Sequence, residues 1–289
     1  MLKDLLKTFK INHYIKNIIV IIPLIFSMSF TNGELWIKCL AIFFAFCFIS
    51  SAVYVLNDLI DVEKDRQHPI KCKRPIASGR ISLPVAILSM LILLTFSCLI
   101  GFKLNLLCLI TILCYFILNI FYSLWLKNIA LIDVACIAIG FVLRVVAGCF
   151  AITVIPSALV ILLTFFASMF FTFTKRKLEL QLNGNNCRPS IKDFNIDVAN
   201  QFILINAILS IAFYFTYVLD KTTIARAGSE YLYITVIPFT LIVFRLLLLV
   251  NISTSENDDP IHFIEKDKPL KFIFWFYVLI LILVLTVLK

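Results

Sequence analysis

The sequence has few charged residues for its length. Charged residues make up 15% of the 289 residues, whereas 62% are hydrophobic and the mean hydropathy is +1.02. No soluble domain needs so much apolar sequence, so a water-soluble fold is excluded. The chain also lacks internal repeats and low-complexity tracts beyond its apolar runs. We therefore read residues 1–289 as a single integral membrane domain.

The nine cysteines and three histidines lack the spacing of a catalytic or metal site. No CxxC pair occurs, and only Cys72 and Cys187 lie in loops, so we read the cysteines as small hydrophobic residues without disulfides. His13, His68 and His262 show no ligand or triad spacing. No Ser/His/Asp or Cys/His grouping is visible. Covalent catalysis therefore has no support in the sequence.

The hydrophobic residues form nine long runs, which we expect to be transmembrane helices. The first run lacks a small-residue cleavage site, so we expect no cleavable signal peptide. The result is an all-α, polytopic membrane protein. The runs lie near residues 18–31, 35–56, 83–101, 104–125, 129–151, 156–174, 199–219, 231–251 and 271–288.

The net charge of +9 could suggest a nucleic-acid partner, but its distribution indicates membrane topology instead. Most Lys and Arg residues lie in segments that would share one side of the membrane: 1–17, 58–82, 175–198 and 252–271. The positive-inside rule then predicts a plasma-membrane protein with its N-terminus in the cytoplasm and its C-terminus outside. Residues 1–16 alternate leucines with lysines, as in an interfacial helix. We expect the active groups on the cytoplasmic side.

The stretch NDLIDVEKD, which begins at residue 57, is the strongest candidate site. On a helix, Asp58, Asp61 and Asp65 fall within roughly 60° of one another, Asn57 borders that face and Glu63 points away. Stacked carboxylates near a bilayer repel each other and are costly. A divalent cation would compensate them, and Mg²⁺ usually binds one or two carboxylates together with substrate phosphates. We therefore predict a Mg²⁺ site at Asn57, Asp58, Asp61 and Asp65 that handles a diphosphate.

Basic residues follow this acidic motif directly. They can be an ordinary positive-inside loop, or they can donate charge-assisted hydrogen bonds to phosphate. We favour Lys73 and Arg74 for phosphate, because Pro75 fixes the local chain direction. Lys16 is either an anchor or a phosphate ligand. Lys175 begins a basic run that is either a stop-transfer signal or part of the site.

A second group of polar residues comprises Tyr122, Lys127, Asp133 and Arg144. Arg144 follows Asp133 by 11 residues, about 20° away on the same helix face and roughly 16 Å deeper. Glycines flank Arg144 and leave room for a chain or head group. Intramembrane ionisable residues are functional by default. The alternative is that Arg144 pairs with a buried carboxylate while the glycines allow close helix packing.

Several of these stretches resemble the UbiA superfamily of membrane prenyltransferases. NDLIDVEKD is similar to the NDxxDxxxD signature of that superfamily. Residues 13–17, 122–151 and 174–180 resemble blocks of its decaprenyl-phosphate phosphoribosyltransferase branch, including YSxxLK, GFxLRxxAG and KRxxEL. The resemblance implies a bundle of nine helices with a central cavity that opens to the cytoplasm and laterally to lipid.

The chain departs from these patterns at two places. Tyr14 replaces the usual Trp, which is a mild change. At Asp133 we expect no second DxxxD motif like that of aromatic prenyltransferases, because Ile137 stands four residues after it. This absence favours the phosphoribosyltransferase branch over an aromatic prenyltransferase.

The resemblance implies Mg²⁺-dependent transfer of 5-phosphoribose from 5-phosphoribosyl 1-diphosphate to a polyprenyl phosphate. In this reading Asp133 orients the ribose or a second metal ion. One alternative is an aromatic prenyltransferase with a polyprenyl diphosphate donor. Another is a cation-coupled transporter, although such sites tend towards the bilayer midplane. The expected metal and catalytic residues are Asn57, Asp58, Asp61, Asp65, Lys127 and Asp133. The expected phosphate or ribose contacts are Lys16, Lys73, Arg74, Tyr122, Arg144 and Lys175.

Overall fold

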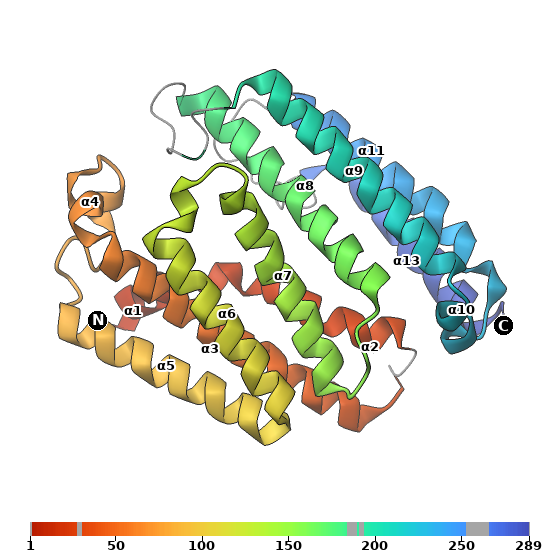
Figure 1. Ribbon diagram of the computed structural model, residues 1–289, viewed down its shortest axis with the longest axis horizontal. Helices are drawn as coiled ribbons and strands as arrows, with labels where there is room; N and C mark the ends of the chain where they lie inside the picture. The colour runs from red at the N-terminus through yellow and green to blue at the C-terminus, as the bar shows by residue number, and fades with distance from the viewer. Residues whose placement is uncertain (1, 28–30, 184–189, 191–193, 253–265, 289) are drawn as a thin grey trace. The chain divides into compact units, whose positions relative to one another are not determined.

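The computed structural model describes residues 2–27, 31–183, 190, 194–252 and 266–288, and in these residues the regular structure is entirely helical (Figure 1). The expectation of an all-α fold is therefore confirmed. The chain forms two compact units. Unit 1 contains Met1–Lys127 and Leu143–Ile155, and unit 2 contains Asn128–Val142 and Pro156–Lys289. The boundary falls inside helix α7 (Ile132–Ala151), so that one helix contributes to both units.

Unit 1 is built around the long helix α3 (Gly33–Ile60), against which α5 (Leu83–Leu104) and α6 (Leu106–Leu124) pack (Figure 1). Asn32 caps α3 by accepting a hydrogen bond from the Glu34 backbone N–H, and such caps satisfy amides that helix ends leave unpaired. The shorter helices of this unit are α1 (Leu2–Phe9), η1 (Ile11–Ile21), α2 (Ile22–Phe26), α4 (Val62–Gln67), η2 (Lys71–Lys73) and η3 (Leu126–Asn128).

The core of unit 1 joins α3, α6 and the last turns of α7. Phe46, Ile112 and Ala147 belong to one buried cluster. At Gly148 the backbone of η1 comes so close that an added Cβ would lie 2.1 Å from the carbonyl oxygen of Val20. Only glycine fits such an approach without moving the backbone.

Unit 2 is a second helical bundle. Helix α8 packs along α9, and α11 contacts both α9 and α13. Its buried cluster includes Phe170, Ile203 and Val243. Asn195 caps α9 and Asp267 caps α13, each with a side-chain oxygen that accepts a backbone N–H. The helices of this unit beyond α7 are α8 (Ala158–Asn183), α9 (Ile196–Leu219), α10 (Lys221–Ala227), η6 (Glu230–Thr235), α11 (Val236–Ile252) and α13 (Lys268–Thr286).

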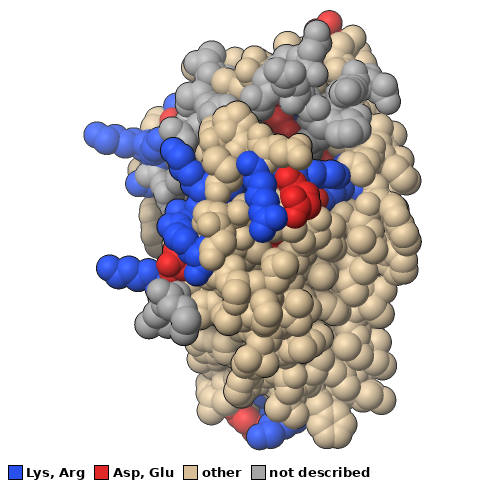
Figure 2. Space-filling view, turned by 90° about the vertical axis from the view of Figure 1, so that its left-hand side faces the viewer, with Lys and Arg blue, Asp and Glu red and all other residues tan. Residues whose placement is uncertain are grey.

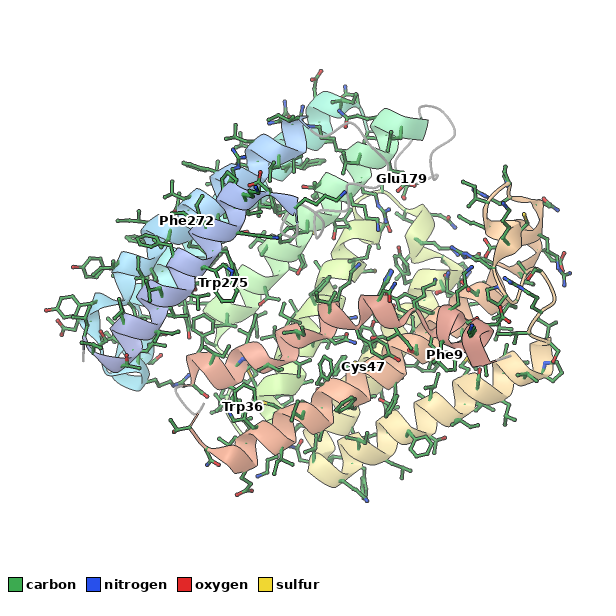
Figure 3. The ribbon with its side chains drawn as sticks, turned by 180° about the vertical axis from the view of Figure 1, so that it is seen from behind. Phe9, Trp36, Cys47, Glu179, Phe272 and Trp275 are labelled. Atoms are coloured by element: carbon green, nitrogen blue, oxygen red, sulfur yellow. The ribbon has the colours of Figure 1, made fainter. Side chains whose placement is uncertain are left out.

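The described residues contain eight helices that are long and apolar enough to cross a membrane. A bent pair at the N-terminus, Lys3–Phe9 and Ile11–Phe26, would make a ninth, in keeping with the nine expected helices. Large apolar side chains also face outwards: Phe272 and Trp275 on α13 are 73% and 66% exposed (Figure 3). On the face in Figure 2, charged side chains concentrate in parts of the surface, and a wide area carries none. The chain is therefore a multi-pass membrane protein.

Candidate active site

The acidic motif lies where α3 ends and α4 begins. Helical hydrogen bonding continues through this junction, because the Asp61 N–H donates to the Asn57 carbonyl over 3.0 Å and the Asp65 N–H donates to the Asp61 carbonyl over 2.8 Å. This continuity keeps Asp58, Asp61 and Asp65 on neighbouring turns, the arrangement from which the sequence predicted one acidic face. Asn57 is half-buried beside them.

Arg74 joins two of the three carboxylates. Its Nη1 atom donates to Asp65 Oδ2 over 2.7 Å and to Asp58 Oδ1 over 3.1 Å. Both aspartates are buried, with 3% and 4% of their surface exposed, so they need such a partner. The loop after α4 carries Arg74 into this position, and Pro75 follows it. Lys73, the second predicted cation of this loop, has an exposed side chain, and its carbonyl accepts a hydrogen bond from Arg80.

Lys127 binds the third carboxylate. Its Nζ atom lies 2.8 Å from Asp61 Oδ1 and 2.7 Å from Asp61 Oδ2. Lys127 is on η3, immediately after α6, and the two residues are 66 positions apart in the chain. The structure thus brings together two residues that the sequence had assigned separately to the site.

Lys10 also reaches the acidic motif, although it was not among the residues expected at the site from the sequence. Its Nζ atom lies 3.6 Å from Asp58 Oδ1 and 4.6 Å from the centre of the Tyr54 ring. Lys10 stands at the bend between α1 and η1, with a φ angle of 51°. The only signal in the sequence was its place in the leucine–lysine alternation of residues 1–16, which indicates a surface helix and not a site.

Arg144 is buried within unit 1 and makes hydrogen bonds to uncharged groups. Its Nε atom donates to Asn17 Oδ1 and its Nη2 atom donates to the Tyr115 hydroxyl, each over 2.8 Å. Its guanidinium carbon also lies 4.8 Å from the centre of the Tyr115 ring. Two other predicted contact residues, Lys16 on η1 and Tyr122 on α6, are half-buried in the same unit. Their roles towards a substrate remain predictions.

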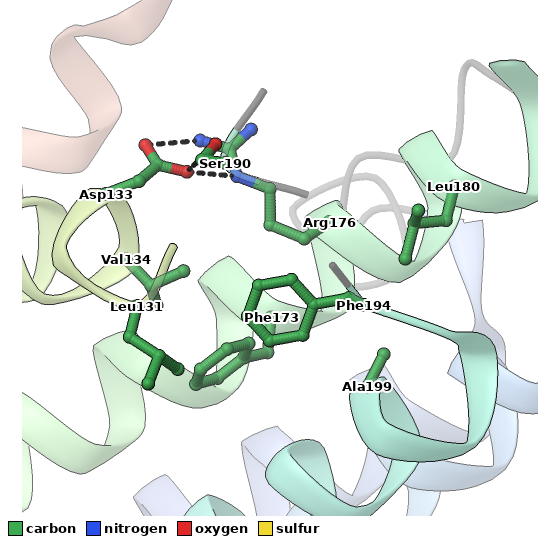
Figure 4. Close-up of a pocket in the computed structure, with 9 residues that line it drawn as sticks. All are labelled: Leu131, Asp133, Val134, Phe173, Arg176, Leu180, Ser190, Phe194 and Ala199. Carbon is green, nitrogen blue, oxygen red and sulfur yellow. Dashed lines mark hydrogen bonds and ion pairs between the residues drawn. The ribbon is translucent and has the colours of Figure 1, made fainter. Parts of the chain in front are cut away.

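Unit 2 contains the remaining candidates. Asp133, at the start of α7, accepts hydrogen bonds from Nε and Nη2 of Arg176 over 2.8 and 2.9 Å (Figure 4). Arg176 also pairs with Glu179 over 2.9 Å, and the Ser190 hydroxyl donates to Asp133 over 3.4 Å. Asp133 and Arg176 line a small pocket together with apolar side chains of α8 and α9. Both oxygens of Asp133 therefore already bind Arg176.

The basic run at the end of α8 divides between surface and interior. Lys175, the predicted contact, is exposed, whereas Arg176 and Lys177 are buried. Lys177 donates to the side chain of Asn251 over 2.8 Å. Arg176 was considered in the sequence only within the basic run Lys175–Lys177 and the KRxxEL stretch, and it was not among the expected site residues. Its signal was that stretch together with Asp133, the acid it binds.

A further ion pair of unit 2 joins α11 to the start of α13. Arg245 and Asp267 form a paired contact, with Nε and Nη2 of the arginine 3.1 and 2.8 Å from the two carboxylate oxygens. Asp267 also caps α13, so this pair has a structural role. The acidic stretch 257–260 lies outside the described residues, as do Cys187 and His262.

The acidic motif fits Mg²⁺ in its chemistry. Among the described residues, no three His, Cys, Asp or Glu side chains converge as a complete metal site. Asp58 and Asp65 nevertheless reach the same nitrogen atom of Arg74, which means that their oxygens approach a common point. Mg²⁺ typically takes one or two carboxylates, and water and substrate phosphates complete its octahedron. Two converging carboxylates satisfy that requirement.

Known proteins are similar to this chain over most of its length. Two relatives that carry the name decaprenyl-phosphate phosphoribosyltransferase are similar over most of their length. The protein from Mycolicibacterium smegmatis is 26% identical across 95% of this chain and 90% of its own, and the one from Corynebacterium glutamicum is 28% identical across 92% and 82%.

Solved structures show the same fold. A UbiA homologue from Archaeoglobus fulgidus, bound to DMAPP and Mg²⁺, superposes with a TM-score of 0.71 at 16% identity, covering 97% of this chain and 99% of the homologue. A model of the UbiA prenyltransferase family matches residues 20–276, which is most of the sequence. The resemblance seen in the sequence is confirmed: the chain belongs to the UbiA prenyltransferase family, whose members are membrane transferases.

Proposed function

We propose that this protein transfers 5-phosphoribose from 5-phosphoribosyl 1-diphosphate to a polyprenyl phosphate. The observation that carries the proposal is the acidic motif, where buried Asp58 and Asp65 converge on one point and Lys127 holds Asp61. The two relatives named decaprenyl-phosphate phosphoribosyltransferase, alike over nearly the whole chain, support this choice of substrates. The chain carries a DxxxD spacing at Asp193–Asp197, contrary to the expectation drawn from Asp133, so the choice against an aromatic prenyltransferase rests on the names of these relatives.

In the proposed reaction an oxygen of the lipid phosphate forms a bond to the anomeric carbon of the ribose. The bond from that carbon to the diphosphate breaks, and the diphosphate leaves with the electron pair. The attacking phosphate is already an anion, so no strong base is needed. The ribosyl carbon passes through an oxocarbenium-like state, as in glycoside transfer. Catalysis then consists largely of positioning and of neutralising charge on the leaving group.

The residues present divide this work by their chemistry. Asp58 and Asp65 would hold Mg²⁺, with Asp61 and Asn57 beside them. When bound, the ion would supply Lewis-acid neutralisation of the leaving diphosphate. Arg74 and Lys127 lie within hydrogen-bond distance of these carboxylates and are the nearest cations for phosphate oxygens.

Arg144, Lys16 and Tyr122, all in unit 1, remain proposed contacts of the substrate phosphates or ribose. Lys73, whose side chain is exposed, is assigned to the outer approach of the soluble donor, and the exposed Lys175 of unit 2 stays a predicted phosphate contact. Asp133 is proposed to act indirectly, because it accepts two hydrogen bonds from Arg176 and so holds that side chain in place. We further infer a plasma-membrane location with a cytoplasmic N-terminus, so that the donor arrives from the cytoplasm.

The test is a transfer assay with the purified full-length protein in lipid. Radiolabelled phosphoribosyl diphosphate, Mg²⁺ and a polyprenyl phosphate are supplied, and label is followed into the organic phase. We expect lipid-soluble label that disappears when EDTA is added. If a polyprenyl diphosphate reacts with an aromatic acceptor instead, the donor proposed here is wrong. Inactivity with both substrate pairs would contradict the proposal and favour the alternative of a cation-coupled transporter.

A further inference from the structure

All three aspartates of the acidic motif already have positively charged partners from the same unit. Arg74 binds Asp58 and Asp65, Lys10 lies 3.6 Å from Asp58, and Lys127 binds Asp61. These cations come from three separate segments: the α1–η1 bend, the loop after α4, and η3. The motif is therefore electrostatically compensated by the protein itself.

Arg74 occupies the position that a metal ion would need. Its Nη1 atom sits between Asp58 Oδ1 and Asp65 Oδ2, the two oxygens on which a bridging cation would sit. A guanidinium nitrogen and a divalent ion cannot occupy that same point, because both are positively charged and the site is largely buried. A metal ion that bridges these two oxygens therefore requires Arg74 to move.

Lys10 is held near the motif by specific packing. Leu5 and Phe9 of α1 pack against the cluster that contains Val55 of α3, and the Ser51 hydroxyl donates to the Phe9 carbonyl over 3.0 Å. The left-handed φ angle of Lys10 then turns the chain by 44° into η1. A non-glycine residue in that conformation costs energy, so the packing around it must maintain it. Helix α1 is thus more than an anchor, because it delivers a charge to Asp58.

We propose that Lys10 and Arg74 are internal counterions that compete with the divalent cation for Asp58 and Asp65, and that they are released towards the substrate phosphates when the cation binds. This inference rests on the metal site of the proposed function. The exchange keeps the buried carboxylates paired in both states, because one set of positive charges replaces another. The released cations remain on short tethers beside the bound ion, where a diphosphate brings new negative charge.

The exchange has a measurable consequence for metal affinity. In the absence of substrate, each counterion opposes the divalent ion. Removal of one counterion should therefore tighten binding of the divalent ion. The same substitution also deletes a residue of the site. A single charge within about 4–6 Å shifts a neighbouring ionisation by about one pK unit or more, so we expect roughly tenfold tighter binding.

The experiment measures Mn²⁺ binding to the full-length protein in detergent by electron paramagnetic resonance, without donor or lipid. Lys10→Gln and Arg74→Gln are compared with the wild-type protein. Lys64→Gln is the matched control, because Lys64 is an exposed lysine of α4 and its loss changes the net charge equally. We expect tighter Mn²⁺ binding in both site variants and unchanged binding in the control.

The outcomes separate this inference from the proposed function. Weaker or unchanged Mn²⁺ binding in folded Lys10→Gln and Arg74→Gln proteins would overturn it, as would equal tightening in Lys64→Gln or the absence of Mn²⁺ binding in every variant. If Arg74→Gln fails to fold, Lys10→Gln alone decides. Tighter binding in a protein that transfers no phosphoribose would support the counterion exchange while contradicting the proposed reaction.

Discussion

Lys127 and Asp61 form a two-point ion pair, with the lysine Nζ atom 2.8 and 2.7 Å from the two carboxylate oxygens. The pair fixes η3, at the end of α6, to the junction of α3 and α4. It holds the Lys127 ammonium group and the Asp61 carboxylate beside the buried Asp58–Asp65 pair. This arrangement makes Asp61 the most informative residue to change.

We expect Asp61→Asn to lower the phosphoribosyl transfer rate by about 100-fold or more. Loss of a preorganised charged group in an active site has effects of this size, and here Lys127 would also lose its partner. The measurement is the initial rate of label transfer at several Mg²⁺ concentrations. Glu63→Gln is the control, because Glu63 is exposed in the same motif and pairs with Arg66. Full Mg²⁺-dependent turnover in Asp61→Asn would remove Asp61 from the site.

We expect Asp133→Asn to destabilise the protein. Arg176 would lose its two hydrogen bonds to Asp133 and keep the contact of Nη1 with the partly exposed Glu179, and breaking a buried pair typically costs about 3–5 kcal/mol. Thermal unfolding in detergent should show a melting temperature lower by roughly 10 °C. Asp197→Asn, at an exposed position in the first turn of α9, should leave it unchanged. An unaltered melting temperature with lost activity would instead assign Asp133 directly to the ribose.

The close approach at Gly148 predicts sensitivity to a single methyl group. In Gly148→Ala the new Cβ would meet the Val20 carbonyl oxygen at 2.1 Å, so η1 or α7 must shift. Such overpacking typically costs about 1–3 kcal/mol. Gly33→Ala is the control, because a Cβ at Gly33 meets nothing within 4 Å. Comparable melting temperatures for the two variants would contradict the packing described here.

The Arg245–Asp267 pair predicts a pH-dependent contribution to stability. The hydrogen bond from Arg245 holds the pKa of Asp267 below its ordinary value. A carboxylate with a lowered folded-state pKa stabilises the fold above its unfolded value of about 3.9, and that contribution disappears as the pH falls through the folded pKa. Asp267→Asn should therefore lower the melting temperature slightly at pH 7, by roughly 1–2 °C for a partly exposed pair.

The measurement is thermal unfolding of both proteins at pH 7 and again below the pKa of the folded Asp267. The difference between wild type and Asp267→Asn should shrink at the lower pH. A difference that stays constant would mean that packing, and not the ion pair, accounts for the effect, because an asparagine can also form the helix cap.

The sequence by itself determined the helical, membrane-spanning architecture. A bilayer leaves backbone amides no water to bind, so long apolar runs must become helices, and eight of the expected spans appear as such among the described residues. The acidic motif was equally readable, because Asp58, Asp61 and Asp65 lie on successive turns of one stretch of chain. Local periodicity carries both kinds of information.

The partners of those acids were decided only by the tertiary structure. Lys73 and Arg74 were both favoured as phosphate contacts, yet only Arg74 turns inward to the acidic motif. Lys10 and Arg176 were not chosen at all. The chain has many lysines and arginines, and each has a long side chain that can reach in several directions. Lys10 is 48 residues from its partner Asp58, and Arg176 is 43 residues from its partner Asp133. Which cation reaches which carboxylate depends on how helices that are distant in the sequence pack, and the local sequence pattern does not specify that packing.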